Sequence, residues 1–171
     1  MKFAICNEMF EDWKIEDVFH YAAEVGYDGV EIAPFTIADR VDEIGTAQRD
    51  AIRRAASDAG VSVVGTHWLL VSPPGMYLTH PNSEIRDRTR DYFVELIKFT
   101  ADIGGNRMIL GSPKQRDVME GVTYEEAWAY ARKLFGDIAP TAEERDVTLC
   151  IEPLGPVETN FIQTAAEAIT M

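Results

Sequence analysis

The sequence has few cysteines and no long hydrophobic segment. Its two cysteines, Cys6 and Cys150, lie far apart and in no Cys-x-x-Cys pair, so they indicate neither a disulfide framework nor a zinc ligand set. The N-terminal apolar run ends at Asn7 and Glu8 and is too short for a signal peptide. The longest apolar stretch, near residues 61–71, falls short of the roughly 20 residues that span a bilayer. We therefore expect a cytoplasmic chain with no membrane partner, and we interpret both cysteines as small, buried, reduced residues.

Positive charge is also scarce. The 29 Asp and Glu residues outnumber the 16 Lys and Arg residues, and the formal net charge is −13. Such a chain repels a phosphate backbone, so we expect no nucleic-acid partner. The first apolar segment is not followed by Gly-x-Gly-x-x-Gly, and no Gly-x-x-x-x-Gly-Lys-Ser/Thr motif occurs. These two absences remove the main sequence support for a nucleotide-binding fold.

The chain does contain a repeated alternation of short apolar segments and longer segments with helical periodicity. This alternation is typical of parallel strands joined by crossover helices, which is the α/β class. Strands are predicted at residues 2–6, 29–33, 61–66, 107–110 and 147–151. The helix predicted over residues 123–144 contains Gly136 and Pro140, and we expect a break or kink there. Five such units form either an open sheet or part of a (β/α)8 barrel, which typically needs about 250 residues.

Polar and aromatic residues gather where the predicted strands end. In both architectures ligands bind beyond the carboxyl ends of the parallel strands. Carboxylates, an imidazole and an indole at one rim are suited to a polyol substrate and a divalent cation. The residues at these ends are Asn7 and Glu8, Glu31, His67 and Trp68, Ser112, and finally Glu152 and Glu158.

Each of these residues also has a purely structural interpretation. Glu152 ends an apolar strand, where a carboxylate needs compensation by a metal ion or a buried cation, or else caps the loop or pairs with a lysine. His67 is either a ligand-binding residue or a hydrogen-bonded structural histidine. Trp68 is either part of a pocket or part of the core. Glu8 and Glu31 can be merely solvated or salt-bridged.

Several segments resemble the sugar phosphate isomerase/epimerase family of xylose isomerase-like TIM barrels. They are GVEI at 29–32, GTHW at 65–68, LGSPKQR at 110–116, and IEPL at 151–154 followed by ETNF at 158–161. The segments occur in the right order and extend over nearly the whole chain. The most specific is the IEPL…ETNF pair.

This resemblance implies a fold and an activity. The fold is a TIM barrel with about five β/α units present, as one incomplete domain over residues 1–171. The activity is divalent-metal-dependent (Mn²⁺, Mg²⁺ or Co²⁺) proton transfer next to a sugar carbonyl, as in ketose 3-epimerases and hydroxypyruvate isomerases. By position, Glu152 would be a metal ligand and an acid/base carboxylate, and Glu158 would bind substrate hydroxyls. His67, Trp68 and Ser112 would line the substrate pocket.

The same resemblance predicts that the chain is incomplete. In such barrels the other metal ligands, an Asp, a His and a second Glu, come from strands six to eight, and the sequence stops after the fifth predicted strand. We therefore expect an isomerase or epimerase chain that is inactive in isolation and can associate through its open sheet edges. The alternative is a non-catalytic module that binds a small polyol or a partner. A DNA-repair endonuclease of the same barrel type is disfavoured by only 3 histidines and the charge of −13.

Overall fold

The computed structural model describes all residues from Met1 to Met171. It contains one sheet of five parallel strands, arranged in the order β1-β2-β3-β4-β5. The strands are β1 (Ala4–Cys6), β2 (Gly29–Ile32), β3 (Ser62–Thr66), β4 (Arg107–Leu110) and β5 (Thr148–Ile151). Each strand therefore lies beside the strand that precedes it in the chain. A doubly wound sheet reverses this order part-way, whereas a barrel continues in one direction, so the strand order is that of a partial barrel.

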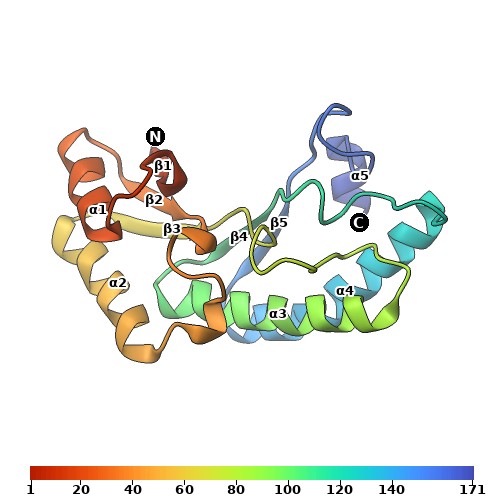
Figure 1. Ribbon diagram of the computed structural model, residues 1–171. Coiled ribbons are helices and arrows are strands. Elements are labelled where there is room, and N and C mark those ends of the chain that lie inside the picture. The colour runs from red at the N-terminus through yellow and green to blue at the C-terminus, as the bar shows by residue number, and fades with distance from the viewer.

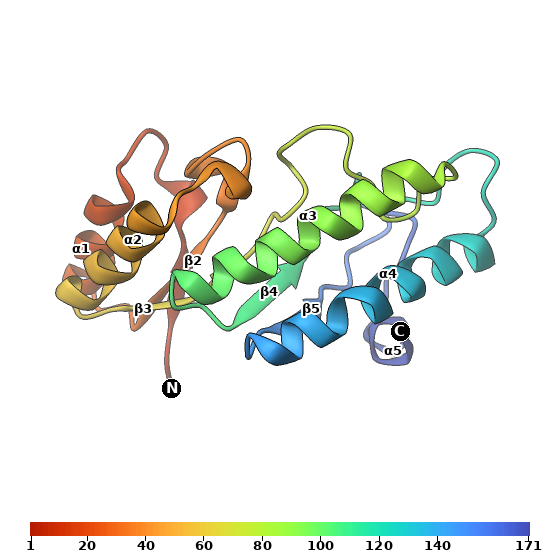
Figure 2. The same cartoon turned by 90° about the horizontal axis from the view of Figure 1, so that it is seen from below.

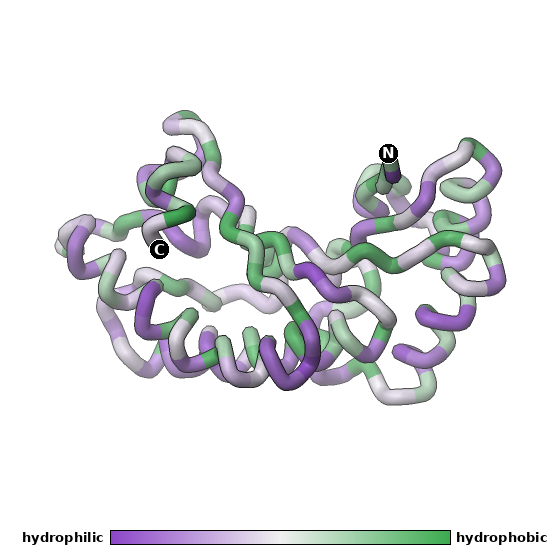
Figure 3. The backbone as a smooth tube through the Cα atoms, turned by 180° about the vertical axis from the view of Figure 1, so that it is seen from behind, coloured by the Kyte–Doolittle hydropathy of each residue, from purple (hydrophilic) through white to green (hydrophobic).

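The helices lie on the outer side of the curved sheet (Figures 1 and 2). They are α1 (Ile15–Glu24), α2 (Thr46–Ala59), α3 (Ser83–Asp102), α4 (Tyr124–Glu144) and α5 (Ala165–Thr170). Figure 1 shows that strands and helices together trace an arc that is open between β1 and β5. Along the helices hydrophobic and hydrophilic residues alternate (Figure 3), as expected for helices that bury one face. No helix combines the length and the hydrophobicity that a membrane crossing requires.

Helix α4 differs from the sequence-based expectation. It runs unbroken from Tyr124 to Glu144 although Pro140 lies inside it. Pro140 has no backbone N–H to donate to the carbonyl of Gly136 four residues earlier, yet the residues on both sides of it stay helical. The helix also starts with a capping box in which Thr123 and Glu126 bond each other's backbone N–H groups. The predicted break is therefore wrong, while the alternative, a kink within an unbroken helix, stays a prediction.

The core lies between the sheet and the outer helices and contains 31 buried hydrophobic residues in one cluster. The central strands supply buried residues such as Ile32, Val63 and Met108, and α3 supplies Phe93 and Phe99. The edge strands β1 and β5 contain no buried residue. The centre of the sheet is thus well packed, while its two edges remain partly open to solvent.

Candidate active site

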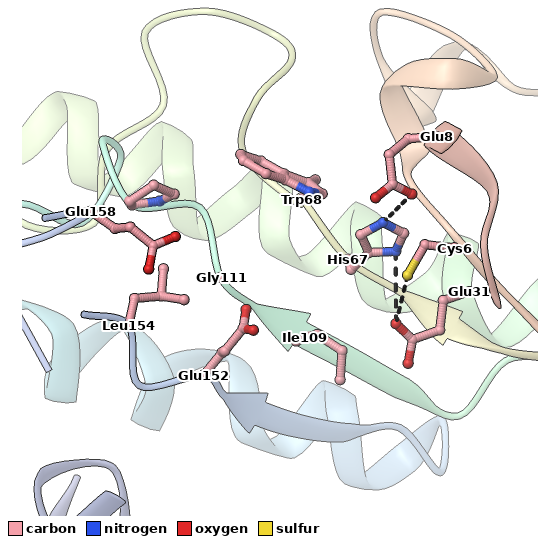
Figure 4. Close-up of a pocket in the computed structure, with 11 residues that line it drawn as sticks. Cys6, Glu8, Glu31, His67, Trp68, Ile109, Gly111, Glu152, Leu154 and Glu158 are labelled. Carbon is pink, nitrogen blue, oxygen red and sulfur yellow. Dashed lines mark hydrogen bonds and ion pairs between the residues drawn. The ribbon is translucent and has the colours of Figure 1, made fainter. Parts of the chain in front are cut away.

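A pocket of about 240 Å³ lies at the carboxyl ends of the strands (Figure 4). Residues within or directly after each of the five strands contribute to it, as expected for a barrel of this type. Its lining consists of Cys6, Glu8, Glu31, His67, Trp68, Ile109, Gly111, Pro113, Glu152, Leu154 and Glu158. The structure therefore brings together most of the polar residues that the sequence placed at strand ends.

His67 is the best-anchored polar residue of the pocket. It follows β3, is only 7% exposed, and its Nε2 lies 2.7 Å from Oε2 of Glu8. A carboxylate can only accept a hydrogen bond, so Nε2 carries the proton of this bond. The other ring nitrogen, Nδ1, is buried without a hydrogen-bond partner and lies 3.9 Å from Oε2 of Glu31. His67 is thus held on one side and unsatisfied on the other.

The position of Glu31 follows from the register of the sheet. Cys6 on β1 pairs with Glu31 on β2, so the two side chains lie on the same face, with Sγ 3.8 Å from Oε2. On the other side a bulge brings Gly65 opposite Glu31. A Cβ at Gly65 would collide with the backbone oxygen of Arg107, so this position accepts no side chain. His67, two residues after Gly65, places its Nδ1 3.9 Å from Oε2 of Glu31.

Cys6 is not the small buried residue that the sequence suggested. Its thiol is half-buried and lines the pocket among carboxylates. Burial, together with the negative charges of Glu8 and Glu31, raises the pKa of the Cys6 thiol to about 12. Cys150 on β5 is also only partly buried, because this strand is at the edge of the sheet. The interpretation of both cysteines as small buried residues is therefore wrong.

Glu152 occupies a very different environment on the opposite side of the pocket. Its backbone N–H donates to the carbonyl of Leu110, which extends the pairing of β4 and β5 by one residue. Its carboxylate lies over Gly111, where a Cβ would collide with Oε2 of Glu152. The side chain is exposed, and its carboxylate makes no hydrogen bond or ion pair with the rest of the chain. The lysine pair considered as an alternative does not form.

The remaining expected residues divide into two groups. Trp68, 43% exposed and with a positive φ of 52°, lines the pocket and is not part of the core. Glu158 also lines the pocket, and its Oε2 accepts a bond of 3.3 Å from the N–H of Gly155. Ser112 is only 1% exposed and accepts a hydrogen bond from the N–H of Leu70. In this structure Ser112 stabilises the loop after β3 through this hydrogen bond, and it does not line the pocket.

One residue near the site was not identified from the sequence as a site residue. Arg116, at the end of the LGSPKQR segment, is 1% exposed, and its Nη1 donates to the carbonyl of Leu110. Its Nε and Nη2 have no partner. Burial lowers the pKa of this guanidinium, and the charges of Glu152, Asp117 and Glu158 act in the opposite direction. The sequence signal was the motif itself, but a buried arginine is hard to recognise because most arginines are exposed.

Comparison with known proteins identifies the family. The family model for xylose isomerase-like TIM barrels matches residues 19–171. The chain belongs to this family. No curated protein matches the chain. Among solved structures, the chain resembles a D-psicose 3-epimerase crystallised in the presence of D-fructose, with a TM-score of 0.83 at 21% identity, covering 99% of this chain and 58% of that one.

Two further structures give the same result. A D-psicose 3-epimerase with D-tagatose from Clostridium cellulolyticum H10 has a TM-score of 0.83 at 19% identity, with 99% and 58% coverage. A 3-keto-D-glucoside 4-epimerase from E. coli has a TM-score of 0.79 at 16% identity, with 99% and 62% coverage. At these identities the similarity demonstrates the fold. The chain spans 58% of the length of the first two structures, which confirms the predicted partial xylose isomerase-like barrel.

The residues around Glu152 do not by themselves form the metal centre expected from the family resemblance. The only three ligand-type side chains whose donor atoms all lie within 4.8 Å of one another are Cys6, Glu31 and His67. Glu152 is not in that group, and a stable oxygen and imidazole site needs several converging ligands. A requirement for Mn²⁺, Mg²⁺ or Co²⁺ at Glu152 therefore stays a prediction that depends on ligands from outside this set.

Proposed function

We propose that this chain carries part of a sugar or sugar-phosphate isomerase/epimerase site, in which Glu152 moves a proton next to a carbonyl. The observation that carries the proposal is the free carboxylate of Glu152, which is held over Gly111 and faces a pocket at the carboxyl ends of barrel strands. A carboxylate with no internal partner is available to a substrate. The similarity of the fold to several ketose epimerases supports a sugar as that substrate.

Other residues of the pocket bind the sugar substrate. Glu158 uses one oxygen for the N–H of Gly155 and keeps acceptor capacity for sugar hydroxyl groups. The half-exposed indole of Trp68 offers an apolar surface to the C–H face of a sugar ring. With the substrate held between these residues, the Glu152 carboxylate takes a proton from the carbon adjacent to the carbonyl. The protonated Glu152 then returns a proton to the same or the neighbouring carbon.

A single carboxylate can transfer protons on only one face of the sugar. Isomerisation requires one face, whereas epimerisation requires a second acid on the other face. The elementary event that this chain can carry out is therefore exchange of the carbon-bound proton with solvent.

This event can be tested by incubating the chain with ketohexoses in D₂O. We expect deuterium at the carbon next to the carbonyl of D-psicose or D-fructose, measured by NMR with and without added Mn²⁺, Mg²⁺ or Co²⁺. The matched variants are Glu152→Gln, which removes the base without changing its shape, and Glu144→Gln, which changes an exposed glutamate on α4. Exchange that falls equally in both variants, or that survives in Glu152→Gln, would refute the proposal.

The alternative is a module that binds a polyol without reacting with it. The isolated position of Glu152, outside any group of three ligands, favours this alternative. Calorimetric titration with the same sugars distinguishes the two functions. Sugar binding that needs Trp68 and Glu158 but gives no exchange under any metal condition would establish the binding module.

We further propose that the chain self-associates through its sheet edges. Strands β1 and β5 each have a neighbour on one side only, and unpaired strand edges are prone to pair with another chain. Light scattering after size exclusion tests this proposal, and a monomer at all concentrations would contradict it.

A further inference from the structure

The β1–β3 side of the pocket contains a cluster of potential metal ligands that the proposed function does not use. Cys6 Sγ, one carboxylate oxygen of Glu31 and one ring nitrogen of His67 all lie within 4.8 Å of one another. The separation is 3.8 Å from Sγ to Oε2 of Glu31 and 3.9 Å from Oε2 to Nδ1 of His67. Figure 4 shows the three side chains pointing toward one another from neighbouring strands.

The hydrogen bonding of His67 leaves one of its ring nitrogens without a partner inside this cluster. Because Glu8 accepts the proton on Nε2, Nδ1 is the ring nitrogen whose lone pair can bind a metal ion. That lone pair is buried without a partner and faces the carboxylate of Glu31, which is also an acceptor. Two acceptors that face each other need a proton or a cation between them. A native structure rarely leaves such a buried atom unsatisfied.

We propose that Cys6, Glu31 and His67 bind a Zn²⁺ ion at a site separate from Glu152. Thiolate, imidazole and carboxylate together form a ligand set that suits zinc better than magnesium or manganese, which prefer oxygen ligands. Tetrahedral zinc places such donor atoms about 3.3 to 3.6 Å apart, as follows from its bond lengths. The observed separations are 3.8 and 3.9 Å. Small side-chain movements therefore bring the donor atoms to the distances that zinc requires.

The surroundings of the cluster fit the same interpretation. Glu8 orients the ring through Nε2, which is the usual arrangement of a carboxylate behind a metal-binding histidine. Cys6, Glu31 and His67 also line the pocket, so an ion enters from the pocket side. Three protein ligands leave the fourth position to water or to an oxygen of a bound molecule. This inference does not depend on the proposed sugar chemistry, because metal binding is measured without a sugar.

Cobalt provides a direct test, because Co²⁺ substitutes for zinc and gives a strong near-ultraviolet charge-transfer band when a thiolate binds it. The whole chain is stripped with a chelator and titrated with Co²⁺. We expect one equivalent to produce the band and Zn²⁺ to displace it. The Cys6→Ser variant should lose the band, and His67→Gln should weaken Co²⁺ binding at least about tenfold.

Control variants show whether the band comes from these three residues. Cys150→Ser and Glu152→Gln should both keep the band, because neither residue belongs to the cluster of Cys6, Glu31 and His67. If Cys6→Ser does not fold, as judged by circular dichroism, the isosteric variant Glu31→Gln should retain the band at saturation with at least about tenfold weaker binding. The proposal is overturned if the native chain gives no band, if the band depends on Cys150 or Glu152, or if NMR shows both His67 nitrogens protonated and unchanged by Zn²⁺.

Discussion

The two sides of the pocket are built differently although both lie at strand ends. On the β1–β3 side, His67 is nearly buried and bonded to Glu8, and the thiol of Cys6 lies close to Glu31. On the β5 side, the carboxylate of Glu152 is exposed and has no partner. The difference follows from which side chains the strand ends bring together. The ends of β1, β2 and β3 lie side by side, and their polar side chains contact one another. The carboxylate of Glu152 meets only Gly111 after the neighbouring strand β4, which has no side chain to pair with it.

Removing the carboxylate of Glu152 should lower the rate of proton exchange without lowering the stability of the protein. For Glu152→Gln we expect solvent exchange of the sugar proton to fall by on the order of a thousandfold, the usual contribution of a general base. The melting temperature should stay nearly constant, because the carboxylate makes no internal bond. Deuterium incorporation and thermal melts measure the two quantities. A large loss of stability with unchanged exchange would contradict the proposed difference between the two sides of the pocket.

The β1–β3 side of the pocket should instead suppress the reactivity of the Cys6 thiol. The pKa of Cys6 is raised to about 12, so the fraction of thiolate at pH 8 lies far below that of an ordinary cysteine. In a Cys150→Ser chain freed of metal, we expect iodoacetamide to react with Cys6 about a hundredfold more slowly than after unfolding in urea. The rate should rise with pH until about pH 12, and Glu31→Gln should increase it by removing a negative charge. Equal rates in the folded and unfolded chains would contradict the assignment.

A substitution at Gly111, which contacts Glu152, is a milder change on the β5 side of the pocket. In Gly111→Ala the added Cβ occupies the place of the Glu152 carboxylate, and the flexible side chain moves away. We expect exchange to fall by about tenfold because the base is displaced, with little loss of stability. Gly155→Ala is the matched control, because its Cβ would lie at an ordinary 3.8 Å from Glu158. Equal activity in the two variants would show that the position of Glu152 is unimportant.

The smallest expected effect is a loss of protein stability from a substitution on the β1–β3 side of the pocket. Glu8→Ala removes the hydrogen-bond partner of the nearly buried His67 and should cost about 1 kcal/mol of unfolding free energy. Urea unfolding measures this value. Glu11→Ala, at an exposed glutamate nearby, should have no measurable effect. Equal stability of the two variants would mean that the bond between Glu8 and His67 does not hold the site together.

Most of the fold could be predicted from the sequence because strand and helix periodicity are local properties. The predicted strands at 107–110 and 147–151 differ from β4 and β5 by at most one residue. The break in α4 was predicted wrongly because the packing of this long helix against α3 and β5 outweighs the backbone hydrogen bond that Pro140 cannot make.

The site was predictable only in part. Glu152, His67 and Trp68 were predicted from their positions at strand ends, and the role of Glu158 was predicted from the family resemblance. The structure places all four around one pocket. Ser112 satisfied the same rule, yet its hydroxyl turns away to the backbone of Leu70. The position of a residue at a strand end does not determine the direction of its side chain.

The sequence by itself determined the alternation of strands and helices and the polar residues that end the strands, because both depend on neighbouring residues. Only the tertiary structure decided that the sheet winds in one direction and that Glu8 meets His67 from 59 residues away. It also decided that Cys6 and Glu31 share one face. Such pairings depend on strand register and on one bulge between β2 and β3, and the register is set by the packing of the whole sheet.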